Sequence, residues 1–175
     1  MAKTWVIKYM DGSKLEVEAE SFKAAVESMR TKLEGADLSF ADLSGADLEG
    51  AALRGTNLLG ANLSRANLSS ADLSFAGLSS AVLIEADLSK AHLVWATLCF
   101  TDLSKSDLSG ADLSKAQIHL ADFSGANLRL ADLRGADVRT SDFSGADLGR
   151  ADLRGAHLRK SDLEGADLEG AAFEG

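Results

Sequence analysis

The sequence predicts an all-β solenoid, that is, a rod made by winding the chain into stacked coils. Between residues 31 and 175 an apolar residue stands at every fifth position, which gives 29 consecutive pentapeptides without an insertion or deletion. Leu is the central residue in 24 of them, and Ala stands two residues before the centre in 23. A period of five fits neither the 3.6-residue period of an α-helix nor the alternation of a strand. The chain must therefore bend after each pentapeptide, with its large and small apolar side chains pointing inward.

The other positions of the repeat indicate how the bends are made. Between the small residue and the central residue stands Asp in 16 repeats and Asn in four, so the unit is Ala-Asp/Asn-Leu-x-x. Asp and Asn form local hydrogen bonds between their side chains and the backbone, which favours turns. Gly at many fifth positions, such as Gly35, Gly45 and Gly50, provides the backbone freedom that a tight bend requires.

These tandem units resemble the pentapeptide repeat family, and the resemblance covers residues 31–175. It implies a right-handed quadrilateral β-helix with four pentapeptides in each coil, hence about seven coils. At about 4.8 Å per coil the rod would be roughly 35 Å long. On this model the pentapeptides that begin at residues 31, 36, 41 and 46 open faces one to four. Each face continues at intervals of 20 residues.

Residues 1–30 lie outside the repeats and predict a β-hairpin followed by a helix. Residues 5–10 are rich in β-forming side chains, Asp11-Gly12 is a turn signal, and residues 15–20 alternate apolar and acidic side chains. Ser21 is a suitable N-cap for the helix that follows. Because an open solenoid end exposes core and unpaired backbone, we expect residues 1–30 to form an N-terminal cap. The alternative is a small recognition module.

Charge and composition exclude several classes of protein. The chain has 27 acidic and 18 basic residues, a formal net charge of −9, which opposes direct binding to nucleic acid or to anionic membranes. No apolar run approaches the length of a membrane span, and the first ten residues lack the apolar core of a signal peptide. The single Cys99 excludes an internal disulfide and fits a reducing compartment. We therefore expect a cytoplasmic protein.

Acidic side chains form the most regular candidate for chemistry. Asp102, Asp122, Asp142 and Asp162 fall on face three in successive coils. They would lie about 5 Å apart, close to the spacing of a glycosidase pair. The repeat itself requires Asp at these positions, however. The three His residues have no metal-ligand spacing, Cys99 has no adjacent base, and no phosphate-binding loop is present. We therefore expect no enzymatic activity, no cofactor and no metal.

Apolar residues at outward positions are the exception that indicates a binding surface. On faces one and two they occur in adjacent coils: Phe75, Val94, Trp95, Phe100 and Leu120. If the two faces meet at a corner, these five residues form one exposed surface. Exposed aromatic clusters usually bind a protein partner. The alternative is that the side chains lie flat on the neighbouring coils and shield the backbone.

Together these features predict a non-enzymatic, rigid scaffold for protein interaction, with a possible regulatory role. The resemblance also implies an alternative, because some pentapeptide repeat proteins modulate DNA gyrase with a rod similar to B-DNA in width and charge. The charge of −9 and the acidic ladder favour this mimicry, whereas basic residues on faces one and two oppose it. Repeats continue to Phe173, so we also expect a homodimer through an open apolar C-terminal end.

Overall fold

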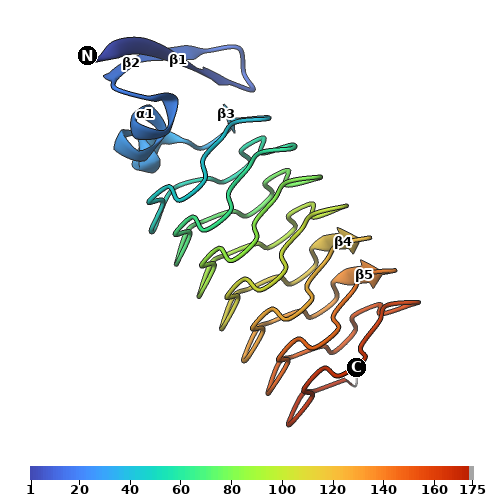
Figure 1. Ribbon diagram of the computed structural model, residues 1–175. Helices are drawn as coiled ribbons and strands as arrows, with labels where there is room; N and C mark the ends of the chain where they lie inside the picture. The colour runs from blue at the N-terminus through green and yellow to red at the C-terminus, as the bar shows by residue number, and fades with distance from the viewer. Residues whose placement is uncertain (174–175) are drawn as a thin grey trace.

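The computed structural model describes residues 1–173, and it places a hairpin and a helix above a regular stack of coils (Figure 1). The elements are β1 Lys3–Tyr9, β2 Lys14–Ala19, α1 Phe22–Ser28, a 3-10 helix Arg30–Lys32, β3 Ala36–Asp37, β4 Gln117–His119 and β5 Asp137–Arg139. Within the described residues, no helix has the length and apolarity that crossing a membrane requires.

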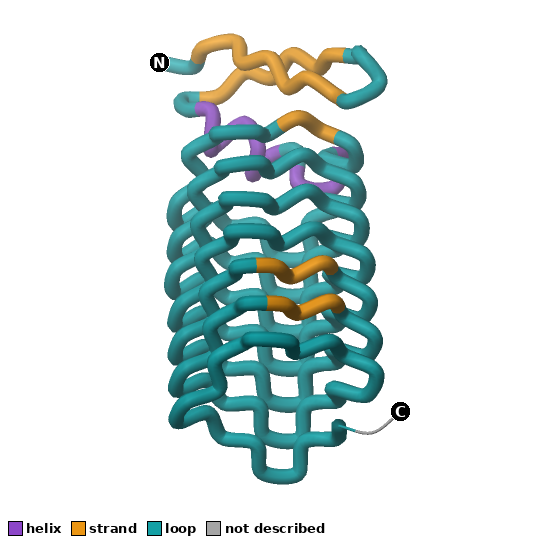
Figure 2. The backbone as a smooth tube through the Cα atoms, turned by 90° about the vertical axis from the view of Figure 1, so that its right-hand side faces the viewer, coloured by secondary structure: helices purple, strands orange, loops and turns teal. Residues whose placement is uncertain are grey.

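The coils repeat every 20 residues. Parallel bridges join residues 20 apart throughout the repeats, from Asp37–Asn57 to Asp152–Ala172. The supporting backbone bonds are short, as in Leu63 N to Val82 O at 2.7 Å. Each coil therefore contains four pentapeptides, and Figure 2 shows these coils stacked in register below the N-terminal segment. Because each side of a coil is so short, most of this pairing consists of isolated bridges, and only β4 and β5 pair as longer parallel strands.

A tight turn ends almost every pentapeptide. Its signature is a hydrogen bond from the first residue of the next repeat to the central carbonyl, as in Ala46 N to Leu43 O at 3.0 Å. The fifth residue of the repeat has a positive φ whether or not it is Gly. Sixteen fifth residues are not Gly, and among them Trp95 and Phe100 each have a φ of 60°. Such a φ turns the side chain away from the coil. The fifth positions are therefore the corners of the rod.

Inward side chains form two buried ladders. Apart from the half-buried Ala41, the central Leu and leading Ala side chains of the described coils are almost completely inaccessible up to Leu153. Phe123 and Phe143 replace Leu in consecutive coils and stack with their ring centres 4.7 Å apart and their planes 2° from parallel. Where the leading residue is Thr, its hydroxyl is satisfied, since Thr101 Oγ1 donates to Leu78 O at 2.8 Å. Burial of these ladders holds neighbouring coils together.

The N-terminal segment covers the first coil. Strand β1 pairs antiparallel with β2 on one edge and with β3 on the other, so the hairpin continues directly into the coil. Ser21 caps α1 by accepting a hydrogen bond from Ala24 N at 3.0 Å. Ile7 and Val26 are buried in the same core as the coils, and the Glu27 carboxylate accepts a hydrogen bond from Asp47 N at 2.9 Å. These contacts satisfy backbone and core groups that the first coil would otherwise expose.

Candidate functional site

The predicted apolar residues lie on two neighbouring corners of the rod. Phe75 and Trp95 are fifth residues of face one, where it meets face two, and about half of each side chain is exposed. Phe100 and Leu120 are fifth residues of face two, where it meets face three, with exposed fractions of 62% and 49%. Trp95 and Phe100 are five residues apart in one coil, so at most about 17 Å of chain separates the two corners. Val94 lies on face one beside Trp95 and is half-buried.

Corner side chains contact residues of adjacent coils. The Phe40 ring lies so close to Gly60 that a Cβ added there would be 2.7 Å from it. The Arg54 guanidinium lies 4.4 Å from the centre of the Phe75 ring, and the Lys115 ammonium lies 5.4 Å from that of Trp95. Each of these cations covers part of an aromatic ring, as cation–π contacts do. Half of the Phe75 and Trp95 side-chain surface nevertheless stays accessible.

Between the two aromatic corners, the floor of face two is uncharged. In the two coils concerned, Gly77 and Thr97 occupy positions where other repeats place Asp, and Ser79 and Cys99 follow them on the same face. We call the aromatic surface the set of Phe75, Val94, Trp95, Phe100 and Leu120. The uncharged floor is a feature that the sequence analysis missed. Its signal is present in the sequence as three consecutive repeats of face two without Asp or Asn at this position, at Gly77, Thr97 and Gln117.

Toward the C-terminus, face two becomes basic. Arg139 binds Asp137 through Nε at 2.7 Å, and His119 Nε2 lies 3.0 Å from the other Asp137 oxygen. The hydrogen bond from Arg139 is the main reason that the pKa of Asp137 lies below its usual value. An open pocket of about 310 Å³ lies here, lined by Asp137, Arg139, His157 and Arg159. We call Arg139, His157, Arg159 and Lys160 the basic end of face two.

On face three, the four Asp residues of the acidic ladder lie in consecutive coils, and each carboxylate has a local structural role. Parallel bridges link Asp102, Asp122, Asp142 and Asp162 in consecutive coils. Each carboxylate accepts a hydrogen bond from the backbone N–H two residues later, as Asp122 does from Ser124 at 2.8 Å. These bonds fix the start of each turn.

Elsewhere in the rod, Asn stacks on the carboxylate of the preceding coil, and Asn67 and Asn127 each lie between two carboxylates. Asn57 Nδ2 donates to Asp37 Oδ1 at 2.9 Å, and Asn127 Nδ2 donates to Asp107 Oδ1 at 3.1 Å. An amide at this position retains the oxygen that the turn needs and adds a donor for the carboxylate of the preceding coil. The sequence analysis did not assign this role to Asn. The spacing of 20 residues between each Asn and its Asp is the signal for it.

No group of three or more His, Cys, Asp or Glu residues in the described part of the chain could hold a metal ion. His92 lies on face one, whereas His119 and His157 lie on face two in different coils. Cys99 is a free, half-buried thiol.

The C-terminal coil is less buried than the others. The central Leu163 and Leu168 are half-buried, and Phe173, predicted as the dimer end, is 47% exposed. Phe173 directly follows Ala172, whose backbone bridges to Asp152 of the preceding coil.

Comparisons with known proteins agree with this architecture. The family model described as pentapeptide repeats matches in eight copies, over residues 30–60, 46–89, 61–98, 76–114, 91–129, 116–145 and 139–175. No curated protein sequence matches the chain.

Solved structures of similar proteins include one described as HetL, a pentapeptide repeat protein involved in heterocyst differentiation regulation from the cyanobacterium Nostoc sp. strain PCC 7120. It is 37% identical over 77% of this chain and 71% of that chain, with a TM-score of 0.43. Another is Rfr23 from the cyanobacterium Cyanothece 51142, 30% identical over 69% and 89% of the two chains, with a TM-score of 0.45. A third is QnrB1, described as a plasmid-mediated fluoroquinolone resistance protein. It is 20% identical over 71% and 68%, with a TM-score of 0.56.

Proposed function

Since this chain belongs to the pentapeptide repeat family, whose members form right-handed quadrilateral β-helices, we propose that it is a rigid, non-enzymatic scaffold that binds a protein partner through the aromatic surface. In this proposal the rod is a right-handed quadrilateral β-helix of about seven coils. Residues 1–30 are its cap domain, and residues 31–175 are its repeat domain. The observation that carries the proposal is the exposure of Trp95 and Phe100 on either side of an uncharged floor.

Three features of this surface support the proposal. Exposed aromatic side chains supply large contact area at low cost in conformational entropy, because few of their torsions must be fixed. Both corners are held by repeated backbone bonds, such as Phe100 N to His119 O at 2.9 Å, so the surface is preorganised. Finally, the floor between the corners carries no charge that would have to be desolvated on binding.

The experiment compares proteins captured from the native cells by immobilised wild type and by a Trp95→Ser/Phe100→Ser variant. The matched control is Phe40→Ser, which removes an aromatic residue with 74% exposure on the corner that carries Phe100, outside the aromatic surface. We expect a specific partner to be retained by wild type and by the control, and lost with the double variant. Equal capture by all three proteins contradicts the proposal, provided that circular dichroism shows each is folded.

The second candidate function is DNA-mimicking modulation of DNA gyrase, favoured by the continuous acidic ladder Asp102, Asp122, Asp142 and Asp162 on a chain of net charge −9. Its test is a gyrase supercoiling assay with and without a fluoroquinolone. Replacing Asp102, Asp122 and Asp142 by Asn keeps the turn acceptors and removes three charges. Inhibition or drug protection that these substitutions abolish supports mimicry, and an absence of any effect on gyrase excludes it.

A further inference from the structure

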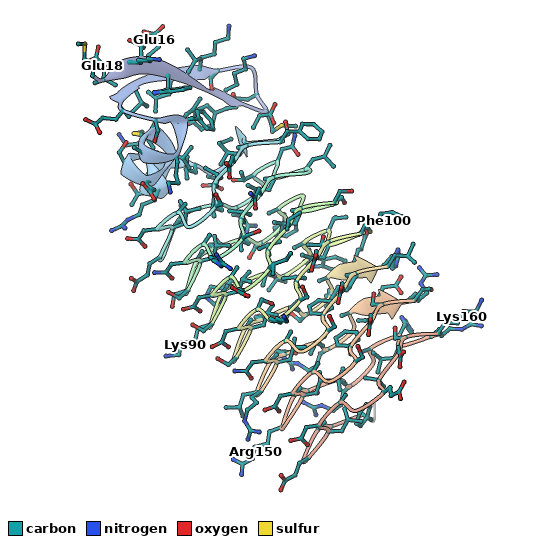
Figure 3. The ribbon with its side chains drawn as sticks, viewed as in Figure 1. Glu16, Glu18, Lys90, Phe100, Arg150 and Lys160 are labelled. Atoms are coloured by element: carbon teal, nitrogen blue, oxygen red, sulfur yellow. The ribbon has the colours of Figure 1, made fainter. Side chains whose placement is uncertain are left out.

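We infer that the partner segment bound by the aromatic surface carries carboxylates, which bind the basic end of face two. This inference rests on the proposed function and names the chemistry of its partner. The aromatic corners and the basic end lie along the same side of the rod, as the labelled Phe100 and Lys160 show in Figure 3. One elongated segment can therefore contact both.

Charge on face two is reversed relative to the rest of the molecule. Lys115, Arg139, Arg159 and Lys160 lie on this face or its corners, opposed there by the single carboxylate Asp137 in the C-terminal coils. A local excess of positive charge on a chain of net charge −9 attracts an acidic partner to this side and orients it during encounter.

Unlike Arg134, Arg139 and Arg154, Arg159 has no acidic residue within its own repeat. Arg134, Arg139 and Arg154 each bind the Asp two residues earlier, with Arg154 Nε 2.8 Å from Asp152 Oδ1. At the equivalent position before Arg159 stands His157. Among residues 1–173 neither Arg159 nor Lys160 forms an ion pair, and both are exposed. Their donors are therefore available to an external carboxylate.

The pocket between these residues has the chemistry that a carboxylate requires. Its volume of about 310 Å³ exceeds that of a carboxylate group, and its lining combines Arg139, Arg159 and His157. Guanidinium groups bind carboxylates with paired, charge-assisted hydrogen bonds. The one carboxylate of the lining, Asp137, is already hydrogen-bonded by Arg139 and His119, which leaves Arg159 as the principal donor.

Distances along the rod set the spacing within the partner segment. Phe100 and Lys160 occupy the same corner three coils apart, which corresponds to about 14 Å at 4.8 Å per coil. An extended segment rises about 3.3 Å per residue. A partner that reaches both sites in extended form therefore places a carboxylate about four residues from its apolar anchor, in either chain direction.

The test is selection of binders from a displayed library of random dodecapeptides against the intact protein, at low salt. Selected peptides are then assayed individually on wild type, on the aromatic variant Trp95→Ser/Phe100→Ser and on the charge variant Arg159→Glu/Lys160→Glu. The matched control is Lys90→Glu/Arg150→Glu, which makes the same charge change on exposed corner residues of face four, on the opposite side of the rod (Figure 3).

We expect enriched peptides to combine apolar and acidic residues at a spacing of about four. Binding should weaken about tenfold or more with the charge variant, change less than about twofold with the control, and weaken with rising salt. Peptides that need Trp95 and Phe100 but carry no excess of Asp or Glu overturn this inference and leave the proposed function standing. If acidic peptides bind in a way that depends on Arg159 and Lys160 but not on Trp95 and Phe100, the result supports the basic site and contradicts the aromatic site. A selection without enrichment overturns both.

Discussion

The Lys115 ammonium lies 5.4 Å from the centre of the Trp95 ring, at the corner where face one meets face two. The two residues are the fifth residues of face one in consecutive coils, so this contact joins the aromatic surface to a basic residue of the coil that carries Leu120. The cation lies over one part of the indole, and half of the Trp95 side chain remains accessible. The corner is therefore partly ordered before any partner binds.

Removing this cation should expose Trp95 further. In a Trp5→Phe background, which leaves Trp95 as the single tryptophan, Lys115→Ala should increase acrylamide quenching of the fluorescence. It should lower the free energy of unfolding by roughly 0.5–1 kcal/mol, since a cation–π contact is lost. Lys105→Ala, at an equivalent corner of face three, is the control. Equal quenching in both variants would show that Lys115 does not cover the ring in solution.

Core and corner side chains should differ sharply in their contribution to stability. Leu98→Ala leaves a cavity in the buried ladder and should cost about 2–5 kcal/mol in urea unfolding. Phe100→Ala, two residues later and 62% exposed, should cost no more than about 0.5 kcal/mol. A loss on substitution of Phe100 as large as that of Leu98 would favour the alternative in which the corner aromatics shield the backbone.

Stacked carboxylates should repel one another wherever Asn does not separate them. Asn57→Asp keeps the acceptor for the turn but replaces the donor to Asp37 with a second negative charge. It should lower the free energy of unfolding by roughly 0.2–1 kcal/mol at low salt, and by less at high salt. Asp122→Asn, between Asp102 and Asp142, should have the opposite sign. Urea unfolding at two salt concentrations measures both changes. The same sign in both variants would contradict this role for Asn.

Acid should weaken the C-terminal coils through the Asp–Arg pairs. The hydrogen bond from Arg154 is the main cause that lowers the pKa of Asp152 to about 2. Because this folded-state pKa lies below the unfolded value of about 3.9, the contribution is complete above that value. It is lost as the pH falls from about 4 toward 2. Urea unfolding of Asp152→Asn between pH 5 and pH 3 should depend less on pH than that of wild type, and Arg154→Gln should behave in the same way. An unchanged slope in both variants would exclude this pair as a source of acid sensitivity.

Much of the architecture could be predicted from the sequence, because each repeat has the same pattern of buried and turn-forming residues. The five-residue spacing identified the Leu and Ala ladders, which, except for the half-buried Ala41, are buried in the structure up to Leu153. The pairing of β1 with β3 could not be predicted, because β3 has only two residues and no pattern of its own that distinguishes it from the other repeats.

For the candidate site, the sequence indicates which residues break the repeat pattern but only part of their arrangement in space. The sequence identified Trp95 and Phe100 as exceptions at outward positions, and both are exposed. That they occupy separate corners on either side of face two depends on the positive φ of each fifth residue, which an apolar pattern does not encode. The free donors of Arg159 likewise become apparent only when its repeat is compared with repeats that pair Arg with Asp.

Site-specific photo-crosslinking in the native cells would show which face of the rod a partner contacts. A benzophenone amino acid is placed either at position 99, on the floor of face two, or at position 104. Position 104 is the equivalent position of face three, five residues later in the chain. Both residues are half-buried in the wild-type protein. An interaction through the aromatic surface predicts a crosslinked partner from position 99 and none from position 104. Crosslinking from position 104 alone would contradict it and would favour a partner on the acidic ladder.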